Sequence, residues 1–175
     1  NSLRSHSTQE TPPGCHRTRG AARRASSAER TLCTALAARY RPRRIPLPAV
    51  TADLGTATTL NVILPGGVFA GGIICAGIQT CLNALAQRTA QLPLLTVEQP
   101  EALIGKNTRA CMLSGAVIGT AALLDGIVTA IEQELGETVS FVITGGGAAY
   151  VDKLVRHPHS YDPNMILKGL AYLYQ

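Results

Sequence analysis

The stretch D-L-G-T-A-T-T-L-N-V-I-L-P-G-G-V-F-A-G-G-I-I-C-A-G, residues 53–77, decides the fold. Its β-branched run at 57–63 is typical of a strand, and a second strand is predicted at 68–74. Between the two, the P-G-G string at 65–67 predicts a tight turn. The stretch therefore predicts a β-hairpin, which begins just after another strand ends at residues 53–56.

The chain that follows the hairpin alternates helices with a strand. Residues 77–91 predict a helix that Pro93 ends, with one apolar face. Residues 139–143 predict a short buried strand, and residues 163–174 a last helix. This order predicts an α/β domain with a mixed sheet and packed helices. The apolar face of the first helix is made of Ile78, Leu82 and Leu85.

A long helix is predicted at residues 109–135, because apolar residues recur at helical spacing and Gly136 supplies a stop. Its apolar part, 115–131, is interrupted by Asp125 and falls short of the ~18 uninterrupted apolar residues that span a membrane. We therefore expect a buried helix and no membrane partner. Since the helix is apolar on more than one face, we expect a second subunit to cover part of it.

The positive charge of the chain is concentrated at its start. Residues 1–50 carry ten Arg and no Lys against two acidic residues, whereas residues 51–175 carry six basic and nine acidic residues. Three interpretations fit: phosphate neutralisation on nucleic acid, a solvated and poorly ordered tail, or an Arg- and Ser-rich transit segment. The segment lacks the aromatic residues and motif context of base recognition, so we expect no nucleic-acid partner.

Cysteine and histidine residues give no sign of a metal site or of a disulfide framework. The five Cys are odd in number and form no C-x-x-C pair, which favours a reducing, cytoplasmic location. His157 and His159 have no carboxylate at ligand spacing in the sequence, so we interpret their segment as a surface loop.

Two glycine-rich strings are the candidates for chemistry. In D-L-G-T-A-T-T, residues 53–59, a glycine lets backbone amides approach an anion and the hydroxyls can donate to phosphate oxygens. In T-G-G-G-A, residues 144–148, the glycines would let a ring or ribose lie against the backbone. The alternatives are that Asp53 is a turn or capping residue, and that 144–148 is a tight strand-to-helix turn.

These strings and others, taken in order, resemble the type III pantothenate kinases of the actin-like, sugar-kinase-like ATPase superfamily. The resemblance runs along most of residues 50–175 and implies an actin-like ATPase (ribonuclease H-like) domain at 49–175, one of two domains of the full family fold. It implies a cytoplasmic homodimer that phosphorylates pantothenate with ATP, the first step of coenzyme A biosynthesis. The further matching strings are F-A-G-G-I-I-C-A-G-I-Q-T, A-L-A-Q-R-T-A-Q-L-P, I-G-K-N-T, S-G-A-V-I-G and D-P-N-M-I-L-K-G-L.

The resemblance also assigns roles to single residues. Asp53 would hold a monovalent cation, K+ or NH4+, near the phosphates of ATP, which binds together with Mg2+. Gly55, Thr56, Gly145 and Gly146 would contact ATP, and Thr108 would reach pantothenate across a dimer interface. In S-A-E-R, residues 27–30, Arg30 would orient the substrate, and Glu29 would accept the proton from the hydroxyl that attacks the γ-phosphorus.

The chain departs from the family pattern at its start. No counterpart of the family's N-terminal D-x-G-N-T domain precedes residue 27, so we expect this polypeptide by itself to transfer no measurable phosphate. Glu29 replaces an Asp, which moves the carboxylate by one methylene. Residues 27–48 are interpreted as a remnant of the acid–Arg motif, a helix and a linker, and residues 1–26 as a disordered basic tail or a misread or truncated gene end. The alternative function is a non-catalytic homologue that acts as a binding or regulatory factor.

Overall fold

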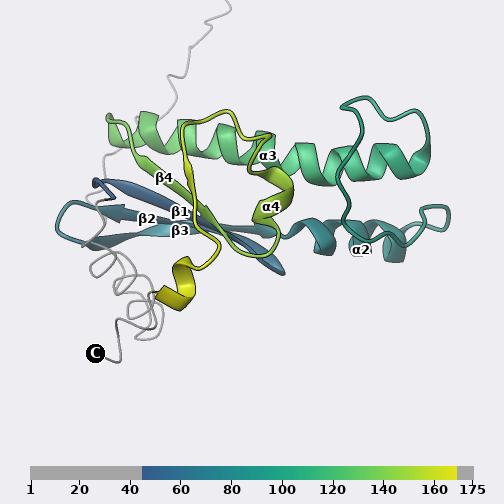
Figure 1. Ribbon diagram of the computed structural model, residues 1–175, viewed down its shortest axis with the longest axis horizontal. Helices are drawn as coiled ribbons and strands as arrows, with labels where there is room; N and C mark the ends of the chain where they lie inside the picture. The colour runs from purple at the N-terminus through teal and green to yellow at the C-terminus, as the bar shows by residue number, and fades with distance from the viewer. Residues whose placement is uncertain (1–44, 169–175) are drawn as a thin grey trace, which may run out of the picture.

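The structure, a computed structural model, describes residues 45–168, and the architecture below refers to these residues. They form a mixed sheet with helices packed on it (Figure 1). The elements are, in chain order, β1 (Ala49–Leu54), β2 (Ala57–Leu64), β3 (Val68–Ala76), α2 (Ile78–Arg88), α3 (Thr108–Leu135), β4 (Ser140–Thr144), α4 (Ala148–Val151) and β5 (Ser160–Tyr161).

The sheet has five strands in the order β3-β2-β1-β4-β5. β1 pairs antiparallel with β2 and parallel with β4, and Asp53 stands opposite Thr144 in the parallel pair. The mixed sheet predicted from the sequence is therefore confirmed. Because β1 and β4 run in the same direction, the two glycine-rich strings that follow them emerge at the same edge of the sheet.

The predicted hairpin is formed by β2 and β3. Its turn is closed by a hydrogen bond from Gly67 N to Leu64 O of 3.0 Å, and Gly66 has a φ of 87°. Pro followed by a residue with positive φ is the combination that a type II turn requires, and only glycine adopts that φ without strain. The P-G-G string thus fixes the hairpin locally.

One hydrophobic core lies between the sheet and the helices α2 and α3. Alternate residues of β1 enter it, because side chains of a strand point to opposite faces in turn. Leu54 is 1% exposed and belongs to this core, so Asp53, one residue earlier, points to the other face of the sheet. Fully buried members of the core include Val50, Ala52, Leu60, Leu82, Val117, Leu124, Val128, Ile143 and Val151.

Helix α3 confirms the long helix predicted from the sequence. The side chain of Asn107 caps its start by accepting from Ala110 N at 2.9 Å, and Gly136 ends it with a φ of 75°. Among the residues that the structure describes, α3 is also the one helix that is long and apolar enough to cross a membrane. Core helices pass the same test of length and composition, and α3 buries Leu113, Leu124 and other residues in the hydrophobic core.

Two predictions about helices need correction. α2 ends at Arg88 rather than at residue 91, because Thr89 is already extended and turns the chain back along the helix. Leu85, predicted on the buried face of α2, is 41% exposed, while Ile78 and Leu82 are buried. Of the helix predicted at 163–174, residues 165–168 are helical, and 169–174 lie outside the described residues.

Candidate functional site

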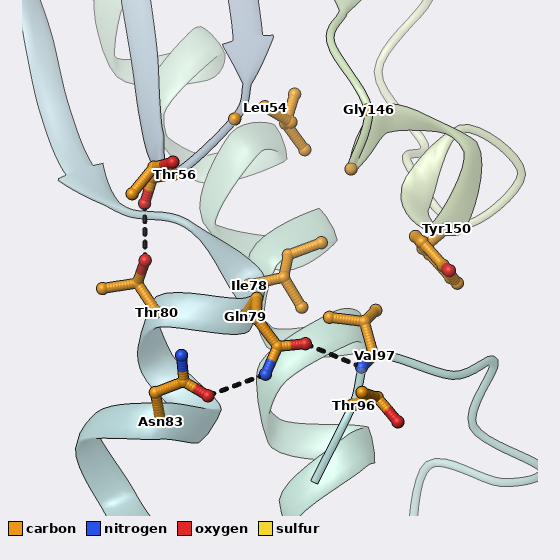
Figure 2. Close-up of a pocket in the computed structure, with 12 residues that line it drawn as sticks. Leu54, Thr56, Ile78, Gln79, Thr80, Asn83, Thr96, Val97, Gly146 and Tyr150 are labelled. Atoms are coloured by element: carbon orange, nitrogen blue, oxygen red, sulfur yellow. Dashed lines mark hydrogen bonds between the residues drawn. The ribbon is translucent and has the colours of Figure 1, made fainter.

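A pocket of about 570 Å³ lies where β1 ends, between the start of α2 and the glycine loop before α4 (Figure 2). It brings together parts of the chain that are far apart in the sequence. Its lining residues are Leu54, Gly55, Thr56, Ile78, Gln79, Thr80, Asn83, Thr96, Val97, Gly146, Gly147 and Tyr150.

The β1–β2 turn is held against the start of α2 by two hydrogen bonds, one from the backbone and one from a side chain. The carbonyl of Thr56 accepts from Gly77 N at 3.0 Å and from the Thr80 hydroxyl at 2.7 Å. A Cβ at position 77 would lie 2.2 Å from Gly55 O, so only glycine fits there. The turn that resembles a phosphate-binding loop is therefore fixed in place by the segment that begins α2.

The second glycine string meets the same turn from the other side. Gly147 N donates to Leu54 O at 2.8 Å, which ties the loop after β4 to the end of β1. Gly145 has a φ of 92°, and a Cβ on it would lie 2.4 Å from Asp53 Oδ1. The two glycine-rich strings thus form one site, in which backbone approaches backbone more closely than a side chain would allow.

Asp53 lies beside this site rather than in the wall of the pocket. Its carboxyl is half-buried, and burial raises its pKa above the usual value. Next to it in the sheet, Thr144 is 2% exposed, and its hydroxyl has no hydrogen-bond partner among residues 45–168. A carboxylate and a hydroxyl oxygen are donors of the kind that hard cations take, so these residues fit a monovalent cation. Within the described part of the chain, no cluster of three His, Cys, Asp or Glu residues could hold a metal ion.

A second hollow of about 570 Å³ lies between α3 and the segment that follows α4. There Asp125 Oδ1 accepts from the backbone N–H groups of Arg156 and His157 at 3.0 and 2.9 Å. His157 Nε2 contacts Glu132 Oε2 at 3.0 Å, and His159 Nε2 contacts Asp152 at 3.2 Å. The carboxylates that the sequence does not place near these histidines therefore come from α3 and from the residue after α4, and they form pairs rather than a metal site.

Comparison with known proteins identifies the family. Residues 30–130, more than half of the chain, match the family described as type III pantothenate kinase. The chain belongs to the type III pantothenate kinase family. The type III pantothenate kinase of Frankia alni is 38% identical over 128 residues, which are 73% of this chain and 51% of that protein. The enzyme of Moorella thermoacetica is 39% identical, over 73% of this chain and 50% of its own length. The chain thus spans about half the length of the curated relatives it matches.

Solved structures agree on the fold. A conserved putative Baf family transcriptional activator from Campylobacter jejuni superimposes with a TM-score of 0.50 and 21% identity, covering 72% of this chain and 56% of that one. At this identity the likeness concerns the fold alone. Together with the five-stranded mixed sheet and its packed helices, it confirms the predicted actin-like ATPase fold.

Within this pantothenate kinase family member, the structure gathers some of the predicted site residues and leaves others apart. Gly55, Thr56 and Gly146 line one pocket, and Gly145 lies against Asp53. Thr108, the first residue of α3, is exposed and is not part of that pocket. Glu29 and Arg30 lie outside the described residues.

Five polar residues of the pocket were not singled out from the sequence: Gln79, Thr80 and Asn83 of α2, and Thr96 and Tyr150. The signal that could have found two of them is their spacing. Gln79 and Asn83 are four residues apart, which places them on one face of a helix. The polar face of α2 lies next to the apolar face predicted from the sequence. No pattern in the sequence indicated that the polar face lines a pocket.

Proposed function

We propose that this chain carries one side of the ATP site, together with the pantothenate contact, of a type III pantothenate kinase. The reaction would transfer the γ-phosphoryl group of ATP to the primary hydroxyl of pantothenate and give 4'-phosphopantothenate. The observation that carries the proposal is the meeting of the strings 53–59 and 144–148 around one pocket in a chain of this family.

Different residues of the pocket would contact different parts of the nucleotide. Gly55 and Thr56, at a turn that α2 holds in place, would contact the phosphates through backbone amides and a hydroxyl. Gly145 and Gly146 would border the adenosine; of the two, Gly146 lines the pocket and leaves room for a ring against the backbone. Phosphoryl transfer depends on positioning and on charge stabilisation, and a turn fixed in advance supplies the first of these.

Two kinds of cation are part of the proposal. Asp53, with the hydroxyl of Thr144 beside it, would hold a monovalent cation, K+ or NH4+, next to the phosphates. Such a cation, with the Mg2+ that accompanies ATP, would offset the negative charge that develops in the transition state. The raised pKa of Asp53 is the expected state of a half-buried carboxyl whose charge no described residue balances.

The acceptor side of the reaction is proposed from the family resemblance. Glu29 would take the proton of the pantothenate hydroxyl, and Arg30 would orient the substrate. Thr108 would contact pantothenate bound to a second copy of the chain. Apolar side chains near Thr108 support a dimer of this kind, since Leu103 is 69% and Ile104 79% exposed. Light scattering of the chain and of an Ile104→Asp variant tests the dimer, and equal monomer masses for both would contradict it.

The alternative is a homologue that binds the same ligands without turning them over. The Glu at position 29, where the family has Asp, favours it, because the added methylene displaces the carboxylate from its reach. Binding of ATP and pantothenate with no turnover, in a protein that also carries the remaining half of a relative, would support this alternative.

An assay of pantothenate-dependent ADP release tests the proposed function. The chain is joined behind the N-terminal half of the Moorella thermoacetica relative, and turnover is measured with and without pantothenate. We expect turnover that requires pantothenate, a large loss in Asp53→Asn, a raised KM for pantothenate in Thr108→Ala and faster turnover in Glu29→Asp. Thr129→Ala, at another exposed threonine of α3, is the matched control. Turnover independent of pantothenate in the folded chimera would contradict the proposal.

A further inference from the structure

The side-chain amide of Gln79 has a single possible orientation. Its Oε1 accepts from Val97 N at 3.0 Å, and its Nε2 donates to Leu95 O at 2.8 Å (Figure 2). A backbone N–H can only donate and a backbone carbonyl can only accept, so these two partners determine which end of the amide is oxygen and which is nitrogen. Gln79 therefore fastens the segment around Leu95 and Val97 to α2 in a defined way.

The orientation of the Gln79 amide determines the orientation of the Asn83 amide, one turn later on α2. Gln79 Nε2 also donates to Asn83 Oδ1 at 2.8 Å, so the oxygen of the Asn83 amide is directed at Gln79. The Nδ2 group must then point away from Gln79, as Figure 2 shows. No residue in the described part of the chain accepts a hydrogen bond from this Nδ2, and Asn83 lines the pocket.

The position of Asn83 indicates which part of a ligand meets it. Thr80 contacts the Thr56 carbonyl, at the turn assigned to the phosphates. Asn83 lies three residues further along the helix, roughly 4.5 Å beyond Thr80 at 1.5 Å per residue. A nucleotide with its terminal phosphate at the Thr56 turn would thus bring the part of the molecule nearer its nucleoside within reach of Asn83.

We propose that Asn83 Nδ2, oriented by Gln79, donates a hydrogen bond to an acceptor on the nucleoside part of a nucleotide in this pocket. Asn83 is then a binding residue, and Gln79 is a positioning residue that acts through it. The inference rests on the proposed function, since it requires that the pocket binds a nucleotide. It adds to that function a pair of residues, Gln79 and Asn83, that would make the pocket bind a nucleotide more tightly than a phosphate chain without a nucleoside.

Titration of the 15N-labelled chain with ADP, followed by NMR, tests the binding role. The side-chain N–H signals of Asn83 are expected to shift on addition of ADP and to stay in place with tripolyphosphate. Asn83→Ala should weaken ADP binding by roughly five- to tenfold, the loss of one ordinary hydrogen bond, and leave tripolyphosphate affinity unchanged.

A second variant and a matched control distinguish the loss of the Asn83 N–H donor from the effect of an added negative charge. Asn83→Asp keeps the acceptor for Gln79 Nε2 but replaces the outward NH2 group by an oxygen, so ADP binding should fall at least as far as in Asn83→Ala. Gln87→Glu adds the same charge to an exposed position of α2 outside the pocket and should leave ADP affinity within about twofold.

The positioning role of Gln79 is tested by a double-mutant cycle. Gln79→Glu keeps the acceptor for Val97 N but can no longer donate to Leu95 O or to Asn83, which is then free to turn its oxygen outward. If Gln79 acts through Asn83, Gln79→Glu combined with Asn83→Ala should bind ADP no more weakly than the weaker single variant. Additive losses would overturn the positioning role and leave Gln79 as a structural residue. Thermal unfolding of each variant provides a check that the fold is intact.

The remaining outcomes are distinct. If the wild-type chain binds ADP and Asn83→Ala binds it equally well, the donor role is overturned and the proposed function stands. If Asn83→Ala weakens tripolyphosphate as much as ADP, the contact is to phosphate and the nucleoside assignment is overturned. If the wild-type chain shows no ADP binding at millimolar concentration, the proposed function fails and this inference fails with it.

Discussion

The two hollows of the molecule are held together in different ways. Around the pocket at the end of β1, backbone meets backbone, and glycine is required at Gly77 and Gly145 because a Cβ would collide with fixed atoms. Between α3 and the segment that follows α4, side chains make the connections, through Asp125 and the His157–Glu132 pair. The first region tolerates almost no change of shape, whereas the second is sensitive to charge and pH.

The largest effect is expected from Gly77→Ala. The new Cβ would lie 2.2 Å from Gly55 O and 2.6 Å from Thr56 O, and neither carbonyl can move without displacing the β1–β2 turn. We expect the free energy of unfolding to fall by roughly 3 kcal/mol, in the range of other overpacked sites. Urea unfolding of the wild type and the variant measures it.

Gly115→Ala is the control for this prediction. A Cβ at position 115 in α3 meets no atom within 4 Å, so alanine there should be neutral or add up to about 1 kcal/mol of stability through its higher helix propensity. If the two alanine variants unfolded at the same urea concentration, the close approach at Gly77 would not be the reason for its glycine.

Asp125→Ala is expected to have the next largest effect. Its carboxylate is the acceptor for the backbone N–H groups of Arg156 and His157, and alanine would leave both without that partner. We expect a loss of about 2 kcal/mol in Asp125→Ala, and a smaller loss in Asp125→Asn, whose carbonyl oxygen still accepts. Equal losses in both variants would show that the charge, and not the acceptor oxygen, matters.

The His157–Glu132 pair predicts a pH dependence of the stability of the fold. Burial alone lowers the pKa of His157, but hydrogen bonds to Glu132 and to the Pro158 carbonyl, with the charges of Glu132 and Asp125, raise that pKa overall. The two ring nitrogens face two acceptors, so only the protonated ring donates to both. The pKa of Glu132 is lowered, first by the hydrogen bond from His157 and then by that from Val139 N.

The directions of the two pKa shifts define the pH range in which the His157–Glu132 pair stabilises the fold. A raised histidine pKa stabilises the fold fully below the unfolded value of about 6.5 and ceases to do so as the pH rises through the folded pKa. A lowered glutamate pKa stabilises the fold above about 4.3 and ceases to do so as the pH falls through the folded pKa. The Tm difference between wild type and His157→Gln should therefore be largest between about pH 4.5 and 6.5. A difference that is constant from pH 4 to 9 would contradict the assignment.

The smallest effect is expected from Thr80→Val. The Thr80 hydroxyl donates to Thr56 O at 2.7 Å and thereby joins α2 to the β1–β2 turn, at a partly exposed site. We expect a loss of about 0.5 kcal/mol in unfolding free energy, at the low end for one hydrogen bond. Thr129→Val is the control, because the Thr129 hydroxyl bonds to Asp125 O within its own helix. A larger loss in the control would show that contacts between elements are not what holds this turn.

Local sequence patterns were sufficient to predict most of the helices, strands and turns. The turn at 65–67 and the helix end at Gly136 follow from proline and glycine chemistry over a few residues, and both were predicted at the right place. The end of α2 was placed three residues too late, because Pro93 was taken as the stop. The chain leaves the helix at Thr89 so that Leu95 and Val97 can return to Gln79, a contact across 18 positions.

The sequence by itself determined which residue types stand at the site, because glycine, threonine and aspartate have backbone and hydrogen-bonding properties that no neighbour alters. It also determined the fold class, since apolar periodicity and turn residues act locally. Only the tertiary structure decided which distant residues meet: Leu54 with Gly147, Gln79 with Val97, and Glu132 with His157. These contacts depend on the parallel pairing of β1 with β4 and on the path of the chain between α2 and α3. Neither the pairing nor the path can be predicted from the distance between the partners along the sequence.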